Sequence, residues 1–234
     1  MTAILKEERI GGQRLILGDC LQVMPLLGRF DAVVTDPPYG INYSGQKESL
    51  KRNGDKGAWR IFHEEKSWDK QSPAAAAFDA IREVSTYQII WGGNYFADKL
   101  PVERGWLVWF KAQTGLTMSD AELAWTNIDQ VLRLINLHRG AMWRDGSQHP
   151  TQKPVALMEW CLGFLPKAQT ILDPFAGSGT TLVACQRLGR NGTGIELDPD
   201  YFAIACKRVD EATRQVDLFI EPPKPAPTQE GFDL

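Results

Sequence analysis

The chain has 234 residues, a formal net charge of −3, 43% hydrophobic residues and four cysteines. The apolar content suffices for the core of one α/β domain, no apolar run reaches the roughly 18 residues of a membrane span, and the charged start lacks the apolar segment of a signal peptide. The negative net charge argues against a protein that holds nucleic acid by overall charge alone, and the separated cysteines fit reduced thiols rather than disulfides or a zinc site.

Strands alternate with helices along the chain, which predicts a mostly parallel sheet with helices on both faces. Two of the expected helices start near a proline, which suits the first turn of a helix. The expected strands are 15–17, 31–35, 88–91, 106–110, 122–125, 131–134, 170–172 and 192–195, and the expected helices are 154–165, 180–188 and 199–214.

Asp36-Pro37-Pro38-Tyr39 follows the hydrophobic run 30–35 directly. The carboxyl ends of strands are where open α/β sheets bind their ligands. Two consecutive prolines have no N–H to donate, so their carbonyl oxygens can accept hydrogen bonds from a ligand. A carboxylate, a free carbonyl and an aromatic ring favour a flat molecule with an amino group, such as a nucleobase.

Two stretches do not fit a compact sheet. Residues 43–73 are polar and rich in Gly, Lys and Ser, and a loop of that length is usually functional or disordered. Residues 221–234 contain several prolines and show no periodicity, so we expect a disordered tail. Residues 1–220, the loop 43–73 included, are expected to form a single domain.

A glycine-rich turn follows the strand 170–172 and leads into a helix, which lets a ligand approach the backbone closely. It reads Asp173-Pro174-Phe175-Ala176-Gly177-Ser178-Gly179-Thr180-Thr181. Glu196 lies 19 positions after Gly177, close to the spacing of about 20 at which an acid reaches ribose hydroxyls. Thr180 stands where an ATP phosphate loop needs lysine, and Leu182 stands where a dinucleotide turn has its third glycine. A nucleoside without phosphates, such as S-adenosylmethionine, remains.

With both motifs present, the chain resembles the amino-group DNA methyltransferases, in the permuted class whose catalytic motif precedes the cofactor motif. Asp36 to Tyr39 resembles the catalytic motif and Asp173 to Gly179 the cofactor loop. His149 to Pro154 resembles the family segment just upstream of that loop, and Gly18-Asp19-Cys20 matches the motif before the catalytic strand. Weaker matches lie at 90–94, 109–111 and 119–122, so the resemblance covers about residues 14–214.

The resemblance implies a Rossmann-like, seven-stranded, mostly parallel sheet with one antiparallel strand, and S-adenosylmethionine as methyl donor. The implied cofactor contacts are Asp173, Phe175, Gly177 and Gly179 on the methionine side, Glu196 at the ribose, Thr151 and Lys153 at the donor's carboxylate, and Asp19 at the adenine, with Ala176, Ser178, Thr180 and Leu197 completing the set. No metal site is expected.

The implied reaction is methylation of N6 of an adenine flipped out of double-stranded DNA. Asp36 and the Pro37 carbonyl would accept the two amino N–H groups, Pro38 would complete the motif, and Tyr39 would stack on the base. Asp36 would be an acceptor that orients the amine rather than a strong base. The alternatives are cytosine-N4 methylation, where the first motif position is more often Ser, and a catalytically silent DNA-binding or clamp-binding protein on the same fold; structured RNA is a weaker candidate substrate.

The expected DNA contacts come from two segments. The loop 43–73 would face DNA through Lys47, Lys51, Arg52 and Arg60, although a solvated loop is the plainer interpretation of a charge run. Residues 126–148 would form a reduced target-recognition region, with Arg139 and Arg144 as contacts. So little material predicts a short recognition sequence.

Gln215-Val216-Asp217-Leu218-Phe219 resembles the pentapeptide by which bacterial replication proteins dock on the sliding clamp. Gln215, Leu218 and Phe219 would then bind the clamp, whereas packing of Leu218 and Phe219 onto the domain is the plainer interpretation. A homodimer is the oligomer considered. The resemblance further implies a cytoplasmic protein of restriction-modification type, at the bacterial nucleoid or encoded by a phage in a bacterial host.

Overall fold

A computed structural model describes residues 2–40, 72–112, 114, 119–138 and 152–214. The strands are β1 (Ile4–Ile10), β2 (Gln13–Gly18), β3 (Phe30–Thr35), β4 (Ser85–Trp91), β5 (Gly105–Phe110), β6 (Ala121–Thr126), β7 (Arg133–Asn136), β8 (Thr170–Asp173) and β9 (Asn191–Glu196). The α-helices are α1 (Cys20–Val23), α2 (Ala75–Val84), α4 (Val155–Gly163), α5 (Thr180–Arg187) and α6 (Pro199–Arg214), with 3-10 turns at η1 (Met24–Leu26) and η4 (Gly93–Tyr95). None of the helices in these ranges is long and apolar enough to cross a membrane.

One sheet runs through the molecule, in the order β1-β2-β9-β8-β3-β4-β6-β5-β7. The fold class expected from the sequence is confirmed, but the count of seven strands with one antiparallel is wrong. The described ranges contain nine strands, and both β1 and β6 run antiparallel to their neighbours. The hydrophobic pattern did not predict β1 because it is an edge strand whose apolar ends are separated by charged residues, Lys6 to Arg9. Charged residues on an edge strand protect a sheet against further pairing.

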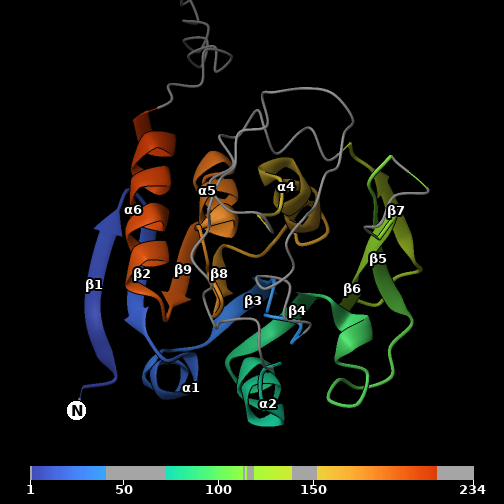
Figure 1. Ribbon diagram of the computed structural model, residues 1–234, viewed down its shortest axis with the longest axis horizontal. Helices are drawn as coiled ribbons and strands as arrows, with labels where there is room; N and C mark the ends of the chain where they lie inside the picture. Colours follow the sequence, from blue (N-terminus) through green and yellow to red (C-terminus); the bar gives the residue numbers. More distant parts are fainter. Residues whose placement is uncertain (1, 41–71, 113, 115–118, 139–151, 215–234) are drawn as a thin grey trace, which may run out of the picture.

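Helices cover both faces of the sheet. Figure 1 shows α4, α5 and α6 on one side of the sheet and α1 and α2 on the other. Side chains of β3 and β4 alternate between two cores: Val34 and Ile89 pack with α4 to α6, whereas Val33 and Ile90 pack with Phe78 of α2. This period-two alternation is what a strand buried on both faces requires.

The expected strands and helices otherwise agree with the structure to within a few residues at their ends. The expected strand 131–134, for example, corresponds to β7 at Arg133–Asn136. Helix α2 was not expected. Its apolar residues Ala77, Phe78 and Ile81 have helical spacing, but its start lies beside the polar stretch that was assigned to the loop.

The sheet topology brings four strand ends together. β2, β9, β8 and β3 are consecutive and parallel, with Leu17 paired to Glu196, Asp173 to Gly194 and Val33 to Leu172. The segments that follow these strands begin at Asp19, Asp36, Pro174 and Leu197 and therefore meet at one edge of the sheet. That edge is where ligands bind in open α/β sheets.

Candidate active site

A cavity of about 340 Å³ opens at the carboxyl edge of the sheet. Segments from all four central strands line it, together with the start of α2 and the residues before α4. The lining includes Asp36 and Pro38 of the catalytic-type motif and Asp19, Lys153, Asp173, Phe175, Ala176, Gly177, Ser178, Thr180, Glu196 and Leu197 of the expected cofactor set. The volume lies within the range of small-molecule sites.

Asp173 lines this cavity and joins the strands β8 and β3. Its Oδ1 accepts a hydrogen bond from the Thr35 hydroxyl at 2.7 Å and another from the Phe175 N–H at 3.1 Å. Burial raises the pKa of the Asp173 carboxyl to about 6, although hydrogen bonds from Thr35, Thr181 and the Phe175 backbone oppose that rise. The carboxylate therefore fixes the start of the glycine turn, and its pKa lies about one unit below neutral pH.

Glu196 fixes the other side of the turn. Its Oε2 accepts the Gly177 N–H at 2.7 Å, and its Oε1 accepts the Asp198 N–H at 2.8 Å. Burial raises the pKa of the Glu196 carboxyl, and these backbone hydrogen bonds lower it. Gly177 has φ of +53°, a conformation that side chains disfavour.

Asp19 and Gly179 also have structural roles. Asp19 caps α1, where its Oδ1 accepts the Leu21 N–H at 2.8 Å, and it lines the cavity as well. Gly179 caps α5 with φ of +79°, and a Cβ there would lie 3.0 Å from the Ala205 Cβ. Gly179 therefore allows α6 to approach the turn, a close packing that the sequence pattern alone did not reveal.

Asp36 lies among donors in the structure. Tyr39 donates its hydroxyl to Asp36 Oδ1 at 2.7 Å, and Lys153 Nζ lies 2.6 Å from Asp36 Oδ2. Burial raises the pKa of Asp36, Lys153 lowers it, and Glu122 raises it further. The resemblance implied that Lys153 meets the donor's carboxylate. In the structure Lys153 lines the cavity, and its ammonium contacts Asp36, Tyr39 and Glu122.

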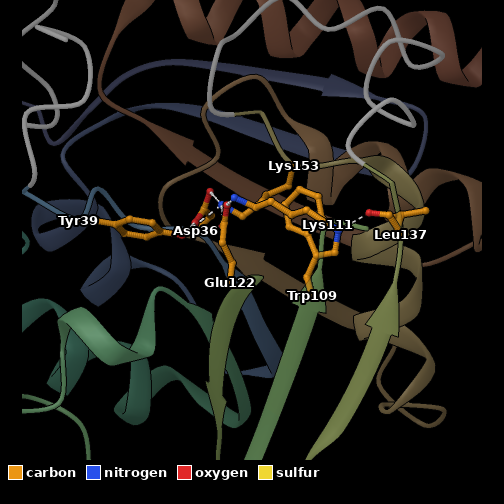
Figure 2. Close-up of polar contacts among 7 residues, drawn as sticks. All are labelled: Asp36, Tyr39, Trp109, Lys111, Glu122, Leu137 and Lys153. Carbon is orange, nitrogen blue, oxygen red and sulfur yellow. Dashed lines mark hydrogen bonds and ion pairs between the residues drawn. The ribbon is translucent and has the colours of Figure 1, made fainter. Parts of the chain in front are cut away.

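Glu122 and Lys111 extend this contact into a row of charges (Figure 2). Glu122 Oε2 lies 3.0 Å from Lys153 Nζ, and Glu122 Oε1 lies 2.7 Å from Lys111 Nζ. Burial opposes ionisation of Glu122, but the two lysines lower its pKa to about 2. Burial lowers the pKa of Lys153, but the carboxylates of Asp36 and Glu122 raise it by more, so the net change is upward. Acidic and basic side chains therefore alternate along the row Asp36, Lys153, Glu122 and Lys111.

Tyr39 lies on an aromatic platform that follows β4. Its ring stacks on Tyr95 with centroids 4.8 Å apart and meets the edge of Phe96 at 6.1 Å. A Cβ on Gly92 would come within 2.2 Å of the Tyr39 ring. Glycine at position 92 therefore makes room for the ring of Tyr39.

Glu122, Lys111, Tyr95 and Gly92 were not predicted as site residues. The segments 109–111 and 119–122 carried a weak family match, and a charged residue at the end of each hydrophobic strand was the signal available. Several predicted contacts lie outside the described residues: Thr151, Lys47, Lys51, Arg52, Arg60, Arg139, Arg144, Gln215, Leu218 and Phe219. Nearly all of the loop 43–73 lies there too, as do residues 139–148 of the recognition region and the tail 221–234.

Comparison with known proteins gives a consistent result. The sequence profile of a DNA methylase family matches residues 108–207. The type II methyltransferase M.HpaI of Haemophilus parainfluenzae is 26% identical over 261 residues, which cover 92% of this chain and 80% of that protein.

Two solved structures show the same fold. M1.HpyAVI, in a complex with SAM, superposes with a TM-score of 0.55 at 21% identity, over 85% of this chain and 99% of that chain. The PvuII DNA methyltransferase, described as cytosine-N4-specific, superposes with a TM-score of 0.56 at 16% identity, over 93% and 92% of the two chains. The chain is therefore similar, in sequence and in fold, to amino-group DNA methylases.

Proposed function

We propose that the chain transfers a methyl group from S-adenosylmethionine to N6 of an adenine flipped out of double-stranded DNA. The observation that carries the proposal is the shared cavity, since Asp36 and Pro38 line the same space as Gly177 and Glu196. An amine bound at Asp36 and a donor bound at the glycine turn would be neighbours. Such proximity is what a direct displacement needs.

The lining of the cavity suits a cationic nucleoside. Carboxylates of Asp19, Asp36, Asp173 and Glu196 all line it, and such a set attracts positive charge and disfavours phosphate. When bound, the donor supplies a methyl group on positively charged sulfur. The M1.HpyAVI complex with SAM supports the same donor for this fold.

Within that cavity, Glu196 is the candidate for the ribose hydroxyls and the turn at Gly177 for the methionine part. A Cβ at Gly177 would meet only the Phe175 carbonyl oxygen, at 4.0 Å, among the described atoms. The turn is therefore open toward a ligand, and a bulky side chain there would compete with the donor.

Asp36 and Pro37 act on the target amine. The carboxylate and the Pro37 carbonyl each accept one N–H, which draws the nitrogen toward tetrahedral geometry and directs its lone pair toward the methyl group. The carboxylate then stabilises the positive charge that develops on nitrogen and accepts the proton after transfer. Tyr39 stacks on the flipped base, a contact worth about 1–3 kcal/mol.

Adenine is favoured because Asp and Tyr occupy the first and fourth positions of the motif. Cytosine-N4 methylation is the second candidate, supported by the fold shared with the cytosine-N4-specific PvuII enzyme. Unmethylated DNA is incubated with the protein and labelled donor and then digested to nucleosides for mass analysis. We expect N6-methyladenine; N4-methylcytosine would contradict the choice of base, and an absence of methylated nucleosides would favour a silent DNA-binding protein.

The role of Asp36 is tested by Asp36→Ala. We expect methyl transfer to fall below detection while the donor still binds, because the substitution removes an acceptor without touching the glycine turn. The matched control is Asp129→Ala. Asp129 is an exposed aspartate that follows the carboxyl end of β6 and pairs with Arg104. Near-normal turnover of Asp36→Ala would refute the assignment.

A further inference from the structure

Lys153 is shared between two carboxylates. Its Nζ lies 2.6 Å from Asp36 Oδ2, 3.0 Å from Glu122 Oε2 and 3.1 Å from the Tyr39 hydroxyl oxygen. An ammonium has three N–H donors, so each can be directed to one of these oxygens. The side chain of Lys153 is 6% exposed, and its charge is consequently screened little by water.

Glu122 is itself held on the sheet. It lies on β6, opposite Trp109 of β5, and its second oxygen is 2.7 Å from Lys111 Nζ. Lys111 follows β5 directly and donates its backbone N–H to the Asp120 carbonyl, and its side chain is 6% exposed. Glu122 on β6 and Lys111 directly after the paired strand β5 therefore support Lys153 (Figure 2).

This arrangement matters for Asp36 because both of its oxygens already have a donor. Tyr39 occupies Oδ1 and Lys153 occupies Oδ2. An ammonium bound to Asp36 alone would withdraw negative charge from the target amine and oppose the positive charge that develops on its nitrogen. An ammonium shared with Glu122 leaves more of the Asp36 charge available.

Resting on the proposed function, we propose that Glu122, supported by Lys111, is a positioning residue that holds part of the Lys153 ammonium and thereby sets how strongly Asp36 accepts the target amine. Asp36 remains the catalytic residue. Glu122 acts through Lys153, and Lys111 acts through Glu122.

The proposal has a signature in the titration of Asp36. The charged and titratable groups that face Asp36 are Lys153, Glu122, Tyr39 and Asp173, with Lys111 behind Glu122 and Tyr95 behind Tyr39. Lys153 lowers the pKa of Asp36 and Glu122 raises it. Loss of the Glu122 charge should therefore lower the pKa of Asp36, whereas loss of the Lys111 charge should raise it.

The experiment compares Glu122→Gln and Lys111→Met in the full chain. We expect Glu122→Gln to reduce kcat by roughly ten- to a hundredfold and to move the acidic limb of the pH profile of kcat/KM downward by on the order of one pH unit. Lys111→Met should move the same limb upward. A site that is merely damaged would lose rate without shifts in opposite directions.

A second measurement does not depend on activity. The Asp36 carboxyl is titrated by NMR in protein carrying carboxyl-¹³C aspartate, and its signal is assigned by its loss in Asp36→Asn. Surface controls are Glu211→Gln and Lys207→Met, which remove an exposed charge pair on α6. The controls should leave both the pH profile and the Asp36 titration unchanged.

The two possible failures are distinguishable. If wild-type protein methylates DNA but the Asp36 titration is unmoved, or moves the same way in both variants, the positioning role is refuted and the proposed function stands. If wild-type protein transfers no methyl group to any DNA, the proposed function fails and the catalytic part of the inference fails with it. If Glu122→Gln does not fold, Lys111→Met still tests the coupling of Glu122 to Asp36, because Lys111 contacts Glu122 on the oxygen that does not contact Lys153.

Discussion

Asp173 shows how one residue serves binding at a cost to stability. The residue is 4% exposed, and its carboxyl joins β8 to β3 through Thr35 and has a pKa raised to about 6. In the unfolded chain the pKa would return to about 3.8. Between these values the folded state holds a proton that the unfolded state has lost, so the stability contributed by this group falls as pH rises from about 4 to 6.

Asp173→Asn should therefore stabilise the protein at neutral and higher pH. The amide keeps an oxygen for the Thr35 hydroxyl and the Phe175 N–H, and it removes a buried charge. We expect the free energy of unfolding to rise by about 1–3 kcal/mol at pH 8 and the gain to shrink as pH falls toward 4, measured by urea denaturation at several pH values. Donor binding should weaken in the same variant. A variant that is less stable than wild type at pH 8 would contradict this account.

The turn after β4 shows how one element positions another. Gly92 has φ of +72° and caps η4, and the following Tyr95 stacks on Tyr39. β4 is paired to β3 in parallel, so the turn at its carboxyl end lies beside the motif that follows β3. The aromatic platform is thus a product of strand adjacency, and it fixes the ring that we propose as the stacking partner of the base.

Gly92→Ala should displace Tyr39, because the new Cβ would lie 2.2 Å from its ring. The matched control is Gly189→Ala, which also has positive φ, at +65°, but has no atom within 4 Å of the added Cβ. Both variants should lose about 1–2 kcal/mol through backbone strain. Only Gly92→Ala should also lose most of its methyl transfer, measured with saturating donor. Equal activity in the two variants would show that the position of Tyr39 does not limit the reaction.

The strand-end motifs illustrate what sequence could predict. Asp36 and Asp173 each end a hydrophobic strand, and the rule for parallel sheets sufficed to bring them to one edge. Glu122 and Lys111 meet across the neighbouring strands β5 and β6, but their position beside Asp36 depends on the insertion of β6 between β4 and β5, a long-range pairing that no local pattern encodes. The contact of Lys153 with Asp36 spans 117 positions, and it depends on the same topology.

The whole molecule poses an electrostatic question, because a chain of net charge −3 is proposed to bind a polyanion. Carboxylates line its cavity, and Lys111 and Lys153 are consumed in ion pairs with Glu122 and Asp36. Affinity for phosphates must therefore come from cations elsewhere on the chain. The sequence concentrates Lys47, Lys51, Arg52 and Arg60 in one segment directly after the catalytic-type motif, and we propose that this segment supplies those contacts.

Replacing these four residues with glutamine should weaken DNA binding and flatten its salt dependence. Each phosphate contact contributes about 0.9 to the slope of log affinity against log salt, so the loss of all four should reduce the slope by about 3 to 4. The control replaces the same number of exposed cations elsewhere: Lys6, Arg104, Lys167 and Lys207. Arg104 and Lys167 precede β5 and β8 and so lie at the edge opposite the cavity. Both four-residue variants change the net charge equally. If the salt slope falls in the variant of residues 47–60 and not in the control, the phosphate contacts lie in residues 43–73. If the two slopes are equal, overall charge and not this segment governs DNA affinity.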